Sequence, residues 1–153
     1  MGFTEGGRSY YQHVYLPALS AVIEPVDPWT LTSDEEVAAA REAGRQRAMA
    51  LTIGRRNAEA IRSSELLVAY LEGQEPDSGT VAELGYAAAL GLTCFGVRSD
   101  FRQCGEAGVS VNLQVETFIT MSGGRICASL HELVAELEVA ASRISSRTRA
   151  LAS

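Results

Sequence analysis

Residues 66–98 read LLVAYLEGQEPDSGTVAELGYAAALGLTCFGVR, and this stretch decides the fold. Its first part, Leu66–Leu71, is a short apolar run typical of a buried parallel strand, and the turn-forming residues EGQEPDSG follow it. The next part, TVAELGYAAALG, is rich in helix formers and ends at Gly91, a residue suited to the position after a helix C-terminus. Thr93–Arg98 predicts a second strand. The stretch therefore predicts a strand–helix–strand crossover.

The segments on either side of this unit predict more helices and two weaker strands. Helices are expected at Glu5–Ser20, at Asp34–Ser63 with a break near Gly44 or Gly54, and from Ser129 to about Ser145. The weaker strands are expected at Ala21–Val26 and Thr117–Thr120. This alternation favours the α/β class, a parallel sheet with flanking helices that binds ligands beyond the carboxyl ends of its strands. We expect a single domain over 1–145 and a frayed tail at 146–153.

Composition limits the kind of protein. The chain has 153 residues, 46% of them hydrophobic and 21% charged, as in ordinary globular domains. A formal net charge of −6 argues against a nucleic acid as partner, and the lack of a long apolar run argues against a membrane. The start lacks a secretion signal, so we expect a cytoplasmic protein. Three cysteines without ligand-like spacing predict no zinc site, and we expect no metal and no cofactor.

Two carboxylates follow the strongest predicted strand. If the helix begins at Thr80, Glu83 lies in its first turn, where the helix dipole keeps a carboxylate ionised. Asp77 precedes the helix and could accept hydrogen bonds from a sugar hydroxyl, and Gly79 permits close approach of the backbone. The same residues also fit a plain capping box formed by Thr80 and Glu83, and the pattern alone leaves both interpretations open.

The segment IRSSELLVAYLEGQEPDSGTVAELGYAAALG, residues 61–91, resembles the motif of the nucleoside 2-deoxyribosyltransferase family, in which a strand leads into a D-x-G-x-x-x-E-x-G-Y-A run. The resemblance implies that Glu83 is the nucleophile and that Asp77 binds the deoxyribose. VNLQVETFI resembles the family segment whose asparagine enters the site of a neighbouring subunit. It therefore implies that Asn112 completes the neighbour's site in a homodimer or a larger assembly.

Two departures from the family pattern affect these expectations. Family members ordinarily open with a strand and a Tyr-x-Ala-Gly-like loop before the segment that starts here at Gly2. The resemblance thus implies a flavodoxin-like or Rossmann-like sheet that lacks this first strand. Asn57 stands where the family carries an aspartate that handles protons on the leaving base. An asparagine can hydrogen-bond a base edge but cannot act as a general acid.

The resemblance implies transfer of a 2-deoxyribosyl group between nucleobases by double displacement, with 2'-deoxynucleosides and free nucleobases as substrates. A hydrolase that uses water instead of the second base is the first alternative. Its 5'-monophosphate substrates would require extra donors, which Arg8, Ser9 and Ser122–Gly124 could supply. The second alternative is a non-catalytic module that binds a nucleoside or nucleotide.

Overall fold

The computed structural model describes residues 5–151, apart from the side chains of residues 147–149 and 151. The chain forms two compact units. The first contains the residues up to Pro25 and those from Glu65 onward, and the second is Val26–Ser64.

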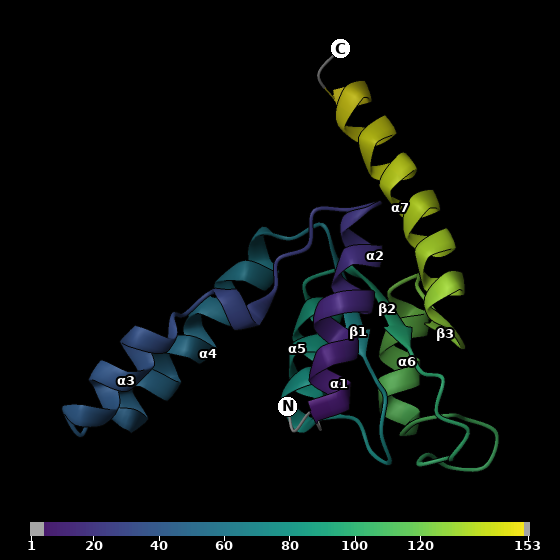
Figure 1. Ribbon diagram of the computed structural model, residues 1–153. Helices are drawn as coiled ribbons and strands as arrows, with labels where there is room; N and C mark the ends of the chain where they lie inside the picture. Colours follow the sequence, from purple (N-terminus) through teal and green to yellow (C-terminus); the bar gives the residue numbers. More distant parts are fainter. Residues whose placement is uncertain (1–4, 152–153) are drawn as a thin grey trace. The chain divides into compact units, whose positions relative to one another are not determined.

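The first unit is built on a parallel sheet of three strands, β1 (Leu66–Tyr70), β2 (Thr93–Val97) and β3 (Ile126–Cys127), in the order β1-β2-β3 (Figure 1). Leu66 pairs with Thr93 and Tyr70 with Val97, so the first two strands run side by side over their full length. Helix α5 (Ser78–Ala89) connects them. The predicted crossover and the α/β class are confirmed.

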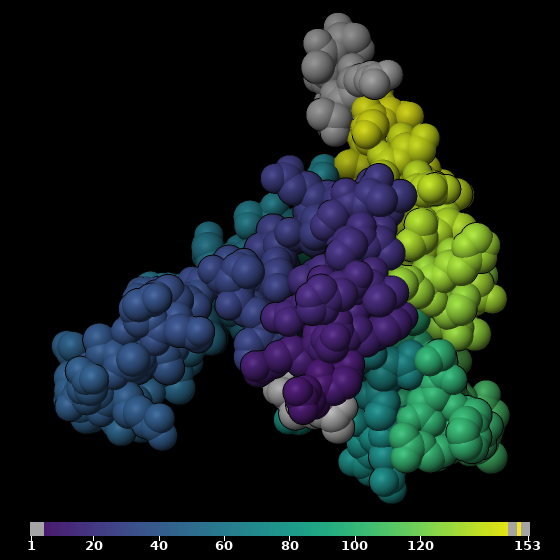
Figure 2. Space-filling model, viewed as in Figure 1, coloured from purple at the N-terminus to yellow at the C-terminus, as the bar shows by residue number. Residues whose placement is uncertain are grey.

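Helices cover both faces of this sheet (Figure 1). On one face lie α5 and α6 (Leu113–Met121). On the other lie α7 (Leu130–Leu151) and a continuous helical segment made of α1 (Glu5–Tyr10), η1 (Tyr11–Tyr15) and α2 (Leu16–Ser20). Figure 2 shows the purple surface of this N-terminal segment against the yellow-green surface of α7.

The alternation of side chains along β2 explains how one strand serves both layers. Phe95 and Val97 join the core cluster under the N-terminal helix and α7. Cys94 and Gly96 face the other layer, where a Cβ atom on Gly96 would lie 2.6 Å from the side chain of Leu71. Gly96 therefore lets that layer pack closely on the strand.

The N-terminal helix contains one π turn, η1, at Tyr11–Tyr15. Its buried residues are Tyr11, Tyr15 and Leu19, spaced four apart. The rings of both tyrosines contact Tyr70 of β1 edge to face, with centroid separations of 6.3 and 5.1 Å. Burial raises the pKa of Tyr15 well above its ordinary value, so its hydroxyl stays neutral at any physiological pH.

The second unit is a pair of helices, α3 (Asp34–Glu42) and α4 (Gln46–Ser63), preceded by the short 3₁₀ turn η2 (Pro28–Thr30). Ser33 and Glu36 form a capping box at the start of α3. Arg56 of α4 donates two hydrogen bonds to the Glu36 carboxylate, which lowers the pKa of Glu36 to about 2.

The structure corrects two expected strands. Ala21–Val26 is not a strand, because Val22 and Ile23 continue the turn at the end of α2 and pack on the core. Thr117–Thr120 is not a strand either, since it lies inside α6. The third strand of the sheet is Ile126–Cys127, a segment that was not predicted as a strand from the sequence.

The predicted helices fare better. The helix at Glu5–Ser20 is confirmed, and the break in Asp34–Ser63 falls at Gly44, whose φ of 65° favours glycine. Gly54 lies within α4. Helix α7 continues to Leu151, beyond the predicted end near Ser145. The single domain over 1–145 with a tail at 146–153 stays a prediction.

The three cysteines are free thiols in different surroundings. Cys94 and Cys127 are completely buried in the core, and burial raises the pKa of both thiols. Cys104 is partly exposed and donates a weak hydrogen bond to the carbonyl oxygen of Ser110 in the same loop. None of the helices within residues 5–151 is long and apolar enough to span a membrane.

Candidate active site at the carboxyl edge of the sheet

Two loops leave the sheet side by side because β1 and β2 are adjacent and parallel (Figure 1). Loop 71–77 leads from β1 into α5, and loop 98–112 leads from β2 into α6. Asp77 ends the first loop as the N-cap of α5, and Asn112 ends the second as the N-cap of α6. The fold thus brings Asp77, Gly79 and Asn112 to one edge of the sheet, where α/β proteins bind their ligands.

Asp77 is held by the helix that it caps. Its Oδ2 atom accepts a hydrogen bond from the backbone N–H of Thr80 at 3.0 Å. This bond lowers the pKa of Asp77, so the carboxylate is ionised at neutral pH. The cap fixes the side chain in one position while leaving it partly exposed to a ligand.

Glu83 is the sixth residue of α5, because the helix begins at Ser78 and not at Thr80. The predicted first-turn position of Glu83 is therefore wrong, and so is the capping box of Thr80 and Glu83: Asp77 is the cap. The helix dipole acts mainly on the first turn and gives no special support to Glu83. Glu83 is half-buried, with its side chain accessible from the surface.

Gly79 occupies the second position of α5, directly beside the capping carboxylate. A Cβ atom on Gly79 would lie 3.0 Å from Oδ2 of Asp77, closer than most real Cβ contacts. The glycine therefore leaves room around the carboxylate, which gives a physical reason for this residue type at the site.

Asn112 is exposed, and its side-chain oxygen accepts a hydrogen bond from the backbone N–H of Gln114 at 2.9 Å. The capping bond uses the oxygen, so the amide nitrogen is the group that would donate to a sugar hydroxyl. Completion of a neighbour's site by Asn112 stays a prediction. Asn57 lies on α4 in the second unit, where it is half-buried, and its contact with a base also stays a prediction.

The stretch Ser122–Gly124 lies near the amino ends of the strands, opposite the carboxyl ends that Asp77 follows. Ser122 accepts a hydrogen bond from the backbone N–H of Cys94, near the start of β2, and donates one to the carbonyl of Ile119. Within one chain this stretch cannot reach a phosphate next to Asp77. The expectation that it supplies phosphate-binding donors is therefore corrected.

Two charged residues at the carboxyl edge were missed as parts of the site. Arg98 directly follows β2, and Glu72 lies two residues after the end of β1; each side chain binds the backbone of the other loop. A charged residue placed just after a buried strand is the signal that could have identified them.

Asp77→Asn is expected to separate the capping role of Asp77 from the sugar-binding role that we predict for it. Asparagine is an equally good N-cap, so the melting temperature should change little. Loss of the charge should lower kcat/KM for a deoxynucleoside about ten- to a hundredfold, since a hydrogen bond to a charged group is stronger than a neutral one. Asp77→Ala should show the same kinetic loss and also cost about 1 kcal/mol of stability. Equal melting temperatures for the two variants would contradict this separation.

The geometry defines an α/β protein with two carboxylates on one helix and polar caps at the carboxyl edge of a parallel sheet. The family model described as nucleoside 2-deoxyribosyltransferase matches residues 1–122. The chain belongs to this family, which supports an enzyme class that transfers glycosyl groups. The match ends before β3 and α7.

The fold has a relative of known structure. A protein described as "Crystal structure of conserved protein from Enterococcus faecalis V583" is similar with a TM-score of 0.54 and 20% identity, over 89% of this chain and 91% of that chain. At this identity the likeness supports the fold alone. No curated protein matches the chain.

Proposed function

We propose that the protein transfers the 2-deoxyribosyl group of a 2'-deoxynucleoside to a second nucleobase, with Glu83 as the nucleophile. The observation that carries the proposal is the pair of carboxylates on α5 in a chain of this family: an ionised, fixed Asp77 at the helix start and an accessible Glu83 farther along. Their Cα atoms are separated by roughly 9 Å of helix rise. Asp77 would hold a sugar hydroxyl while Glu83 attacks.

The reaction proceeds in two displacements. A carboxylate oxygen of Glu83 attacks the anomeric carbon, the bond to the base nitrogen breaks, and its electron pair leaves with the base, which takes a proton. A nitrogen of the second base then attacks the same carbon, the ester bond breaks and the Glu83 carboxylate is restored, while the proton that this nitrogen carried is released to water. Two inversions give net retention of configuration.

Protonation of the leaving base is the step in which this chain differs from the family pattern. Asn57 has no acidic proton at physiological pH, so it cannot supply this proton, and its hydrogen bond to a base edge stays a prediction. The proton then comes from water. Bases that leave easily should therefore be the better substrates.

The experiment is to incubate the purified chain with a 2'-deoxynucleoside, with and without a second free base, and to separate the products by chromatography. A new deoxynucleoside that forms only with the second base establishes the transferase. Free deoxyribose formed without an acceptor would replace it with the hydrolase. Binding of the deoxynucleoside without turnover would leave a non-catalytic binding module.

A further inference from the structure

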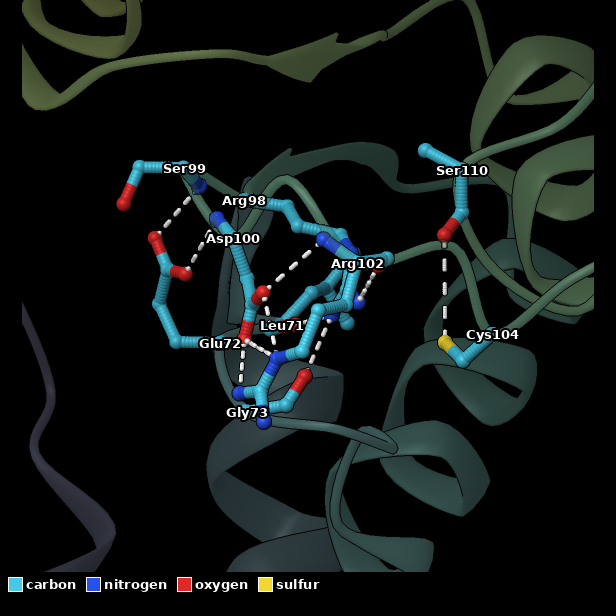
Figure 3. Close-up of polar contacts among 9 residues, drawn as sticks. All are labelled: Leu71, Glu72, Gly73, Arg98, Ser99, Asp100, Arg102, Cys104 and Ser110. Carbon is cyan, nitrogen blue, oxygen red and sulfur yellow. Dashed lines mark hydrogen bonds and ion pairs between the residues drawn. The ribbon is translucent and has the colours of Figure 1, made fainter.

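The carboxyl edge contains a reciprocal set of hydrogen bonds between the two loops (Figure 3). Arg98, at the start of loop 98–112, donates from Nη1 to the carbonyl oxygens of Leu71 at 2.6 Å and Gly73 at 2.9 Å. Glu72, in loop 71–77, accepts from the backbone N–H groups of Ser99 at 2.6 Å and Asp100 at 3.0 Å. Each loop therefore holds the backbone of the other. We call Glu72, Arg98 and these four bonds the Glu72–Arg98 clasp.

Arg98 is an unusual residue for a purely structural contact. It is 4% exposed, and its guanidinium donates three hydrogen bonds to main-chain carbonyls, the third from Nη2 to Arg102 at 2.6 Å. Its Nε atom is buried and makes no hydrogen bond within the described part of the chain. Burying a charge in this way costs stability compared with an apolar side chain of similar size. Maximal stability is therefore a poor explanation for an arginine here.

The far side of the clasp is also fixed. The carboxylate of Asp100 accepts from the backbone N–H of Arg102 at 3.0 Å and pairs with its guanidinium. This pairing holds the pKa of Asp100 below its usual value. These bonds order residues 100–102, next to the backbone that the Glu72 carboxylate binds.

The clasp lies near the start of the two loops that end in the polar caps of the candidate site. Asp77 follows Gly73 by four residues, and Gly73, with a φ of 102°, is the point where loop 71–77 bends. At the other end of loop 98–112, Val111 is completely buried against Gly105, and Leu113 N–H donates to Glu106. Loop 98–112 is therefore fixed at both ends, with the clasp at its start and Asn112 at its end.

We propose that Arg98 is a positioning residue, which acts through the Glu72–Arg98 clasp to hold loop 71–77 so that the Asp77 carboxylate meets the deoxyribose. The inference rests on the proposed function, because it assigns Arg98 a role in sugar binding by Asp77. Without the clasp, α5 remains folded, but loop 71–77 samples other positions, so Asp77 at its end is no longer held in place relative to the rest of the carboxyl edge. Substrate affinity then falls more than the rate of the chemical step.

The test is a double-mutant cycle between Arg98→Met and Asp77→Asn, with KM and kcat measured separately. Methionine fills much of the same volume without donors. We expect Arg98→Met to raise KM for the deoxynucleoside about tenfold and to change kcat less. In the Asp77→Asn background, Arg98→Met should have little further effect on KM, because both changes remove the same interaction.

Three companions make the result decisive. Glu72→Gln removes the charge from the other half of the clasp and should also raise KM. This variant keeps the inference testable if Arg98→Met folds poorly. Arg98→Lys keeps a donor for the carbonyls of loop 71–77 and should restore part of the affinity. Arg125→Met breaks a surface ion pair with Glu136 and should leave KM unchanged.

Each outcome decides between the claims. The positioning role is overturned if the wild type is active and Arg98→Met changes only the melting temperature. It is also overturned if the KM effect of Arg98→Met adds fully to that of Asp77→Asn. In both cases the proposed function stays intact. A folded wild type that neither binds nor converts a deoxynucleoside removes the proposed function, and this inference with it.

Discussion

Glu83→Gln is expected to lower the rate of deoxyribosyl transfer by at least about 10⁴-fold, which corresponds to about 5 kcal/mol of transition-state stabilisation. Glutamine keeps the size and hydrogen-bonding groups of the side chain but cannot form the ester intermediate. Binding of the deoxynucleoside should persist, since Asp77 is unchanged. Single-turnover kinetics and calorimetric binding would separate the two steps, and mass spectrometry of the wild type should detect the deoxyribosyl adduct on the α5 peptide.

A matched control is Glu138→Gln on α7, an exposed glutamate outside the candidate site. Its activity and melting temperature should match those of the wild type. If Glu83→Gln kept more than about a tenth of the wild-type rate, Glu83 would not be the nucleophile.

Gly124→Ala is expected to give a large loss of stability. A Cβ atom on Gly124 would lie 1.8 Å from the carbonyl oxygen of Cys94 and 2.7 Å from its carbon, so the backbone of β2 must shift. The segment before β3 would then lose its register with β2, including the bond from Gly96 N–H to Arg125 O. We expect a loss of about 3 kcal/mol or more, which lowers the melting temperature by roughly 6–12 °C.

The comparison variant is Gly54→Ala. Gly54 lies inside α4 with ordinary helical backbone, and a Cβ atom there meets nothing within 4 Å. Alanine is the better helix former by up to about 1 kcal/mol, so this variant should keep or raise the stability of its helix. Equal effects of the two variants in thermal unfolding would refute the steric argument for Gly124.

The sequence predicted the parts of the fold that local pattern determines. The apolar runs of β1 and β2 and the helix-forming stretch between them were sufficient to identify the crossover. Thr117–Thr120 misled because β-branched and aromatic residues favour strands. In the structure Asn112 starts a helix before them, and Val115 and Ile119, four residues apart, bury one face of it.

For the candidate site, the sequence supplied residues to propose but not their geometry. Resemblance to the family selected Asp77, Glu83 and Asn112, but the start of α5 was misplaced by two residues. Both Asp77 and Thr80 are good caps, and only the folded loop decides between them. The position of Arg98 after β2 could have marked it as a candidate, but its partners could not be predicted from sequence, because they are backbone carbonyls, which any residue carries.

Because the three thiols differ in exposure, the native chain can be labelled selectively in a loop of its candidate active site. Cys94 and Cys127 are sealed in the core, whereas Cys104 lies partly exposed in loop 98–112, between the clasp and Asn112. A thiol-specific reagent applied to the folded protein should therefore label Cys104 first, and the labelling rate should report how far that loop is open. Protection of this one thiol by an added deoxynucleoside can be followed without introducing a single substitution.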